Sequence, residues 1–240
     1  MLLSINELRG RYARAFEGMG FPAGLAPDAA RIAATLDILG DDGLSRVLDR
    51  LDRLDGVKLP VPDLAVDGSS ARLDGHGGSL LAVGADVLDV LDVLTQQHGE
   101  ARIEVHGCRD VDFVTGLGGL AAARGIEGAL LASLEDRERL VRVAQRRAEV
   151  QEGPPGTFAG VPADGLLVLG GQFVDTLDAS ACTTTLGFGA FDERHDDALE
   201  NGVRVDDADW KRIYALGGRL LVPEMGDAAA NAGVGGGTPF

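Results

Sequence analysis

The chain has 240 residues, of which 45% are hydrophobic and 25% charged, and 22 Lys and Arg against 38 Asp and Glu give a formal net charge of −16. This balance is ordinary for a globular protein with one sizeable core, and the negative charge argues against a nucleic-acid partner because it would repel a phosphate backbone. No apolar run approaches the roughly 18 residues of a membrane span, and the first residues lack a secretion signal, so we expect a cytoplasmic protein without a membrane partner.

The first sixty residues have the pattern of helices. Ser4 followed by Glu7 forms a capping box, in which the hydroxyl accepts from a free backbone N–H while the carboxylate reaches back, and it predicts a first helix. Pro27 suits the first turn of a second helix, and a leucine-spaced third helix is predicted over residues 43–54. Residues 1–60 are therefore predicted to form an N-terminal helical segment.

The remaining chain, residues 61–240, has the pattern of an α/β domain that forms one compact unit with the helical segment. Strands and helices alternate, which is typical of a parallel or mixed sheet with helices on its faces. The predicted elements are a strand near SARLDG, a helix over 79–97, a strand at ARIEVHG, a short helix at LGGLAAARG and a strand at GALLAS. They continue with a polar helix over 135–149, a linker at EGPPG, strands at TFAGV and GLLVLG, a helix at DADWKRIYALGG, an LLVP segment and a glycine-rich tail.

Three motifs could belong to a site, and each has a plainer interpretation. Residues 116–121, GLGGLA, fit the GxGxxA pattern of a dinucleotide-binding turn, although the helix that follows is short because Gly125 ends it. The four histidines match no metal-ligand spacing, and DERHDD at 192–197 also suits a solvated loop, so we expect no metal site. Cys108 and Cys182 lack a CxxC spacing, and we expect two partly buried thiols.

Four segments, taken in order, resemble the malate/L-lactate dehydrogenase family of the Ldh2 type, which is distinct from the Rossmann lactate dehydrogenases. The segments are GFPAGLAPDAARIAATLDILGDDGLSRVLDRLDRL, LDGHGGSLLAVGADVLDVLDVL, ARIEVHGCRDVDFVTGLGGLAAARGIEGALL and GTFAGVPADGLLVLG, which cover most of residues 20–170. The resemblance implies a non-Rossmann α/β fold in which the N-terminal helical segment packs on a mixed sheet with helices. The ending ADWKRIYALGGRLLVPEM also resembles a bacterial family of uncharacterised proteins.

The chain departs from the resembled family at the positions that carry its chemistry. Asp42 stands where the family has a proton-transferring histidine, and Asp112 replaces a second histidine. Arg46 is retained where an arginine suits a substrate carboxylate, but the family's lysine-glycine-tyrosine-glycine cofactor segment has no counterpart. The resemblance therefore implies Arg46 as a substrate-binding residue and Asp42 and Asp112 as candidate catalytic residues. As plain turn residues, the two aspartates would instead cap the helices that follow them, and Asp41 is interpreted as a turn residue.

These replacements bear on the reaction. Reduction of a keto acid needs a proton donor near neutrality, which histidine supplies and an ordinary Asp, with a pKa of about 4, does not. We expect a non-dehydrogenase or catalytically altered descendant that binds a small carboxylate metabolite, with a shared proton if the two carboxylates converge, or that acts as an accessory protein of a partner enzyme. The alternative is an NAD(P)-dependent reductase or dehydrogenase of 2-oxo, 2-hydroxy or cyclic imino acids, and only this alternative names a cofactor. We also expect a homodimer, since the related fold builds its cleft between subunits.

Overall fold

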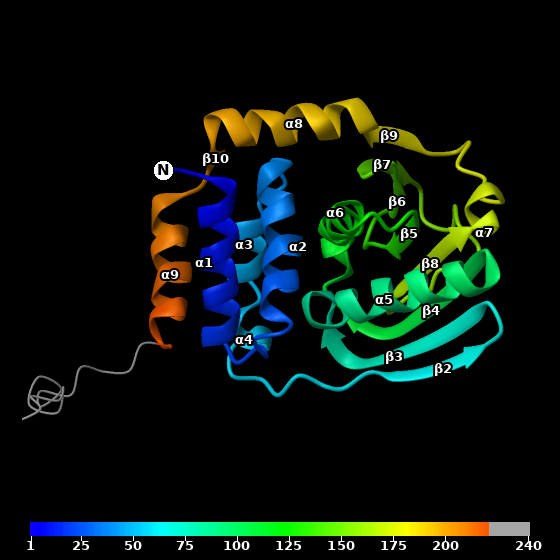
Figure 1. Ribbon diagram of the computed structural model, residues 1–240, viewed down its shortest axis with the longest axis horizontal. Coiled ribbons are helices and arrows are strands. Elements are labelled where there is room, and N and C mark those ends of the chain that lie inside the picture. The colour runs from blue at the N-terminus through cyan, green and yellow to red at the C-terminus, as the bar shows by residue number, and fades with distance from the viewer. Residues whose placement is uncertain (221–240) are drawn as a thin grey trace, which may run out of the picture.

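The computed structural model describes residues 1–220, and most of the LLVP segment and the glycine-rich tail predicted after the last helix lie outside them. Helices α1 to α4 and α9 gather in one half of the molecule, and the sheet with α5, α6 and α7 fills the other, while α8 crosses above both (Figure 1). The helices are α1 Ile5–Gly18, α2 Ala26–Ile38, α3 Gly43–Leu48, α4 Leu51–Leu54, α5 Leu80–His98, η1 Val111–Phe113, α6 Val114–Arg124, α7 Gln172–Asp175, α8 Phe188–Asn201 and α9 Asp207–Gly218. The strands are β1 Leu2–Leu3, β2 Asp63–Asp67, β3 Ser70–Ser79, β4 Glu100–Arg109, β5 Gly128–Ser133, β6 Glu138–Ala144, β7 Arg147–Gly153, β8 Leu166–Gly171, β9 Thr183–Leu186 and β10 Val203–Arg204.

The sheet is mixed, as the sequence predicted. Its eight strands lie in the order β2-β3-β4-β8-β5-β6-β7-β9. Strands β3 and β4 are parallel and α5 connects them, whereas the other neighbours in the sheet are antiparallel. Strand β1 pairs with β10 outside this sheet, so the C-terminal helix α9 returns to pack on α1. The α/β fold class predicted from the sequence is confirmed.

The N-terminal helices follow the sequence signals closely. The hydroxyl of Ser4 accepts a hydrogen bond from the backbone N–H of Glu7 at 3.2 Å, which confirms the predicted start of α1. Helix α2 carries Pro27 in its first turn, as predicted. The single helix predicted over residues 43–54 is wrong, because the structure breaks it into α3 and α4 at Arg50, whose guanidinium turns towards the sheet half of the molecule.

The polar helix predicted over residues 135–149 is wrong, since this segment forms the β6–β7 hairpin. Leu140 and Val141 are both buried because the two faces of the sheet are covered here, and this hides the alternating pattern of a half-buried strand. The turn residues Gln145 and Arg146 have φ values of 51° and 63°. Two-residue turns of this kind are usually marked by Asn-Gly or Asp-Gly, so the sequence lacked the signal of a hairpin.

Two further predictions fail around the sheet. The segment DLAVD, which precedes the first strand predicted from the sequence, forms the edge strand β2, and TFAGV is a loop rather than a strand. The EGPPG segment is not a free linker, because the buried carboxylate of Glu138 accepts from the backbone N–H groups of Gly156 at 3.1 Å and Phe158 at 2.7 Å. Each peptide group held in this way fixes the loop against the sheet.

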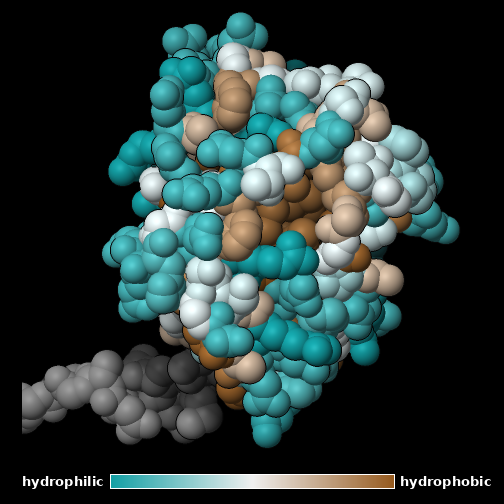
Figure 2. Space-filling view, turned by 90° about the vertical axis from the view of Figure 1, so that its right-hand side faces the viewer, coloured by the Kyte–Doolittle hydropathy of each residue, from teal (hydrophilic) through white to brown (hydrophobic). Residues whose placement is uncertain are grey.

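Apolar side chains lie on both faces of the sheet. The larger core fills the space between the sheet, α5, α6 and the N-terminal helices. A smaller core of six residues covers the other face beneath the segment that leads to β9, and Figure 2 shows apolar side chains in a hollow on this side of the molecule. Within residues 1–220, no helix is long and apolar enough to cross a membrane.

Candidate functional site

The turn between α2 and α3 places the first of the candidate residues. Gly43 packs so closely on α2 that a Cβ atom there would lie 2.2 Å from the carbonyl oxygen of Ala33, which makes glycine the residue that fits. Asp42 is exposed, with a φ of 51°, and its side chain makes no capping hydrogen bond, so its predicted capping role is wrong. The backbone N–H of Leu44 donates instead to Oδ1 of Asp37 at 2.9 Å, and Asp37 supplies the cap of α3 from within α2.

Arg46 and Asp112, which are 66 residues apart in the sequence, are in direct contact. One terminal nitrogen of Arg46 lies 3.0 Å from Oδ2 of Asp112. The other lies 2.6 Å from Oδ1 of Asp41, whose backbone carbonyl also accepts from Nε at 3.0 Å. Asp41, interpreted from the sequence as a turn residue, therefore forms an ion pair with the guanidinium of Arg46. Asp112 lies within η1 rather than capping it, because Asp110 holds the position before that helix.

These contacts belong to one continuous row of alternating charges. Each of its four carboxylates bridges two arginines, at N···O separations between 2.6 and 3.8 Å. In spatial order the row is Arg53, Asp110, Arg50, Asp112, Arg46, Asp41, Arg139, Glu152 and Arg137. We call it the arginine row. It starts on α4, passes through the η1 region and ends on β6 and β7, so it joins the helical half of the molecule to the sheet.

A hollow of about 460 Å³ opens beside the arginine row. All five arginines of the row line it, together with the four carboxylates of Asp110, Asp112, Glu135 and Asp136. A second hollow of about 270 Å³ lies on the far side of Arg139 and includes Asp41 and Glu152. Asp42 lines neither hollow, and no histidine does. The arrangement is chemically suited to hold a small anion through guanidinium groups.

Arg139 is the most buried arginine of the row. The side chain of Arg139 is 8% exposed, and it donates to Oε1 of Glu152 from two nitrogens, at 2.9 and 2.6 Å. Its third nitrogen donates to the hydroxyl of Thr115 at 3.2 Å. Arg139 lies in the segment that sequence analysis interpreted as a polar helix, so it was missed. The clue was the Arg-x-Arg pattern of residues 137–139, which appears meaningful only once the hairpin is known.

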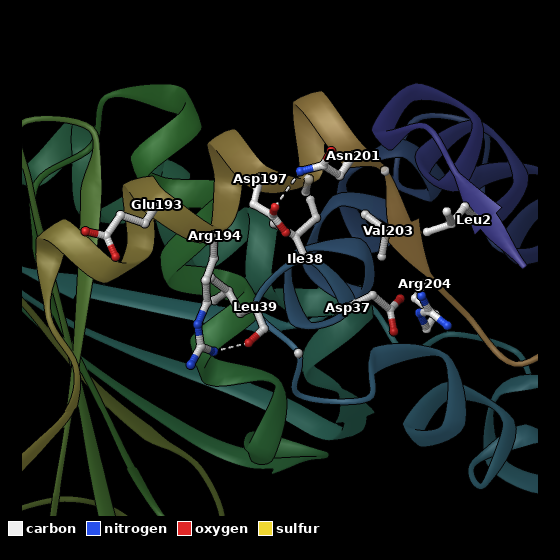
Figure 3. Close-up of a pocket in the computed structure, with 13 residues that line it drawn as sticks. Leu2, Asp37, Ile38, Leu39, Glu193, Arg194, Asp197, Asn201, Val203 and Arg204 are labelled. Atoms are coloured by element: carbon white, nitrogen blue, oxygen red, sulfur yellow. Dashed lines mark hydrogen bonds between the residues drawn. The ribbon is translucent and has the colours of Figure 1, made fainter.

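Asp37 is a second residue that sequence reasoning missed. It faces a hollow of about 690 Å³ that lies between the end of α2 and α8. Figure 3 shows Asp37 and Arg204 among the residues that line this hollow, with Arg194 and Glu193 on α8 towards its other end. Burial raises the pKa of Asp37 to about 6, although hydrogen bonds from the hydroxyl of Tyr12, at 2.6 Å, and from the backbone oppose that shift. The available signal was an acidic residue in the otherwise apolar last turns of α2.

The comparisons with known proteins agree with this architecture. The family described as "Protein of unknown function (DUF3726)" matches residues 3–74, which include the turn that carries Asp41, Asp42 and Arg46. No match was found among curated proteins. A malate dehydrogenase from Pyrococcus horikoshii is similar in structure, with a TM-score of 0.67, 11% identity, and coverage of 91% of this chain and 95% of that one.

Two further solved structures are similar to the same degree. The Δ1-piperideine-2-carboxylate reductase from Pseudomonas syringae has a TM-score of 0.64 at 13% identity, over 90% of this chain and 99% of that one. The sulfolactate dehydrogenase from Methanocaldococcus jannaschii has a TM-score of 0.60 at 12% identity, over 90% and 96%. The chain has the malate/lactate dehydrogenase fold. The resemblance drawn from the sequence is therefore confirmed for the fold.

The glycines of the GLGGLA segment do not cradle a dinucleotide in this example of the malate/lactate dehydrogenase fold. They lie inside α6, where Cβ atoms would come 2.2 Å from Ile32 at Gly116, 2.4 Å from Val141 at Gly118 and 2.4 Å from Thr35 at Gly119. They serve close packing of α6 on α2 and β6, so the interpretation of residues 116–121 as a phosphate-binding turn is wrong. Within residues 1–220, no group of three His, Cys, Asp or Glu could hold a metal ion.

Proposed function

We propose that this protein is a non-dehydrogenase or catalytically altered descendant of the malate/lactate dehydrogenase fold that binds a small anionic metabolite of the carboxylate class. The observation that carries the proposal is the hollow beside the arginine row, where five guanidiniums meet four carboxylates in a strongly acidic chain. A guanidinium presents donors in a fixed fork that matches a carboxylate, so it binds this class with defined orientation.

The ends of the arginine row offer the most accessible donors. Arg53 and Arg137 have side chains that are 42% and 43% exposed, whereas Arg46 is already engaged by Asp41 and Asp112. A ligand carboxylate therefore either binds at the exposed ends of the row, Arg53 and Arg137, or exchanges with Asp112 at Arg46. Either route keeps Arg46 as the anchor that fixes the charges around the ligand.

Acid/base chemistry by Asp42 and Asp112 is part of this proposal. It requires a ligand that reaches both, because Asp42 stands on the exposed turn while Asp112 lies within the hollow. Asp42→Asn and Asp112→Asn test the chemistry. Loss of turnover with retained ligand binding in either variant supports a catalytic role, and unchanged turnover in both removes it.

The binding proposal is tested by thermal denaturation with millimolar mono- and dicarboxylates at constant ionic strength. A ligand that binds the folded protein raises its melting temperature, and the rise grows with the logarithm of ligand concentration. Arg46→Ala should abolish the rise, while the matched control Arg72→Ala, an exposed residue of β3 on the other side of the sheet from α5, should keep it. If no carboxylate raises the melting temperature, the proposal fails.

The alternative is an NAD(P)-dependent reductase or dehydrogenase of 2-oxo, 2-hydroxy or cyclic imino acids. What supports it is the structural likeness to proteins named as dehydrogenases and a cyclic imino acid reductase over about 90% of the chain. It predicts that NADH or NADPH raises the melting temperature. No change at millimolar concentration of either nucleotide removes this alternative.

We also propose that the protein forms a homodimer. As a second possible function, we propose that it is an accessory protein of a partner enzyme. Apolar side chains exposed on and before the edge strand β2 support an interface: Val61 is 83% exposed, and Leu64 and Val66 are about half exposed. Light scattering on the purified protein tests the dimer, and a monomer mass contradicts it. Co-purification of a heteromeric complex from the native host tests the accessory role, and recovery of the protein alone contradicts it.

A further inference from the structure

A cavity away from the arginine row is lined by two arginines that have no carboxylate partner within residues 1–220. It measures about 230 Å³ and lies between α1, α2, α6 and α8, on the other side of Ile38 and Leu39 from the hollow of Figure 3. Since a water molecule in the liquid takes up roughly 30 Å³, the cavity has room for a small anion with a few waters. The polar side chains that line it are Arg9, Thr35, Arg146, Asp192, His195 and Asp196.

Arg9 is the group in this cavity that lacks a partner. Within residues 1–220, its Nε is buried without a hydrogen-bond partner, and no carboxylate lies within 4.0 Å of its guanidinium. Burial lowers the pKa of Arg9, and the positive charge of Arg31 on α2 lowers it further. Because a guanidinium stays charged in proteins, this site holds a partly desolvated cation beside a second cation.

A second arginine without a carboxylate partner lines the cavity. Arg146 reaches back from the hairpin turn and donates to the carbonyl oxygen of Ala123 at 3.2 Å, and in the described chain it has no carboxylate partner. Of the two carboxylates, Asp192 is engaged by Nε of Arg147 at 3.0 Å. Asp196 alone is left to face two guanidiniums within residues 1–220. A buried cation without a partner is costly, and an anion bound between these groups would remove that cost.

We propose that the cavity between α1, α2, α6 and α8 is a binding site for a small oxyanion, phosphate or carboxylate, held by Arg9 and Arg146. The terminal guanidinium nitrogens of Arg9 and Arg146 donate to its oxygens, and the imidazole of His195 borders the ion from α8. The bound anion ties α8 to the helices beneath it. This site is separate from the hollow at Arg46 and does not depend on the function proposed for that hollow.

The probe for this site is inorganic phosphate, with sulfate and acetate compared at the same ionic strength set with KCl. Phosphate should raise the melting temperature in proportion to the logarithm of its concentration. In Arg9→Met the apparent affinity should fall about tenfold or more, as expected when a charged hydrogen-bond donor is lost. Arg11→Met, on the same helix but stacked over Tyr214, should respond like the parent. Because acetate could also bind at Arg46, a larger response to acetate than to phosphate assigns the Arg9 cavity to carboxylates only if Arg9→Met removes that response.

A second measurement locates the ion. The ring resonances of His195 should shift on addition of phosphate, while those of His76 and His106, which lie at β3 and β4, should stay in place. His195→Gln identifies the shifting signal. The proposal is overturned if no oxyanion raises the melting temperature of the parent protein beyond the KCl control, if Arg9→Met keeps the full response, or if the His195 resonances do not move.

Discussion

The arginine row and the Arg9 cavity use the same residue type in opposite ways. In the row, every carboxylate bridges two guanidiniums, and the charges are satisfied within the protein. In the cavity, the guanidinium of Arg9 is partly desolvated with no carboxylate within reach in residues 1–220. A network in which every charge is paired stabilises the structure that contains it, whereas a guanidinium without a partner is stabilised when an anionic ligand binds. Substitutions of arginine should therefore differ in sign between the two regions.

The largest effect on the free energy of unfolding is expected at Arg139, the most buried arginine of the row. Arg139→Met removes both hydrogen bonds to Glu152 and leaves that carboxylate in a poorly solvated place. Breaking a buried ion pair in this way costs about 3–5 kcal/mol, and partial solvation of Glu152 puts the expectation at the lower end. Urea denaturation of the variant and the parent measures the loss.

The double variant Arg139→Met with Glu152→Gln controls for lost packing. It should recover part of the stability, since the carboxylate that has lost Arg139 and keeps only Arg137 as a partner is gone while the volume stays similar. If Arg139→Met alone is as stable as the parent, the arginine row contributes nothing to the fold, and the contrast with the cavity disappears.

The next effect concerns Asp37, at the hollow between the two regions. Its pKa in the folded protein, about 6, lies above the ordinary value of 3.8, so the folded state binds this proton more tightly than the unfolded state. The associated stability is complete below about pH 4 and is lost as the pH rises through 6, with a total of roughly 3 kcal/mol. Asp37→Asn lacks this pH-dependent contribution because an amide does not titrate. Its oxygen can still accept the hydrogen bond from the backbone N–H of Leu44.

The difference in stability between Asp37→Asn and the parent should thus change in favour of the variant from pH 4 to pH 7.5. Using the difference removes the contribution of the other carboxylates, which titrate in both proteins. Tyr12→Phe tests the same carboxylate, because it deletes the hydroxyl whose hydrogen bond to Asp37 lowers the pKa of that group. A constant difference between parent and Asp37→Asn over this pH range contradicts the prediction.

A smaller effect with the opposite sign is expected at Arg9. In a buffer free of phosphate, Arg9→Met should be as stable as the parent or more stable by up to about 1 kcal/mol, because a partly desolvated cation is replaced by an apolar chain of similar length. Chemical denaturation checks this against Arg139→Met under the same conditions. A loss of several kcal/mol at Arg9 would mean that this arginine is matched after all, and would erase the difference between the two regions.

The smallest effect is expected at the exposed end of the arginine row. Arg53 lies 3.4 Å from Asp110 with a half-exposed side chain, and exposed ion pairs are worth about 0–1 kcal/mol. Arg53→Gln should cost less than 1 kcal/mol, and the cost should vanish in high salt through screening. Equilibrium unfolding at low and high NaCl measures it. A loss of stability in Arg53→Gln that does not change with salt would contradict the prediction that the exposed end of the row contributes least.

Much of the fold was predictable because its signals are local. The capping box at Ser4, the apolar stripe of α5 and the strand ARIEVHG each depend on a few neighbouring residues, and each element formed as expected. The β6–β7 hairpin was not predictable in this way. Its strands are buried on both faces and its turn lacks glycine and asparagine, so neither the period nor the turn chemistry was visible.

The candidate site was predictable only in part. Resemblance placed Arg46 and Asp112 in one cleft, and the structure brings them into contact at 3.0 Å. The same reasoning chose Asp42 over Asp41, and the backbone decided otherwise, because the positive φ of Asp42 turns its side chain out while Asp41 reaches the guanidinium. The role of Asp42 stays a prediction. Sequence spacing alone does not show which of two neighbouring aspartates in a tight turn faces the arginine.

The sequence by itself determined the α/β fold class, the N-terminal helices and the acidic character of the chain, since these follow from local pattern and composition. Only the tertiary structure decided which charges meet. The partners of Arg139 and Asp112 come from segments far away in the sequence, and Arg9 is left without one within residues 1–220. Electrostatic pairing depends on distance in space and on burial, and neither quantity is encoded at any single position of the chain.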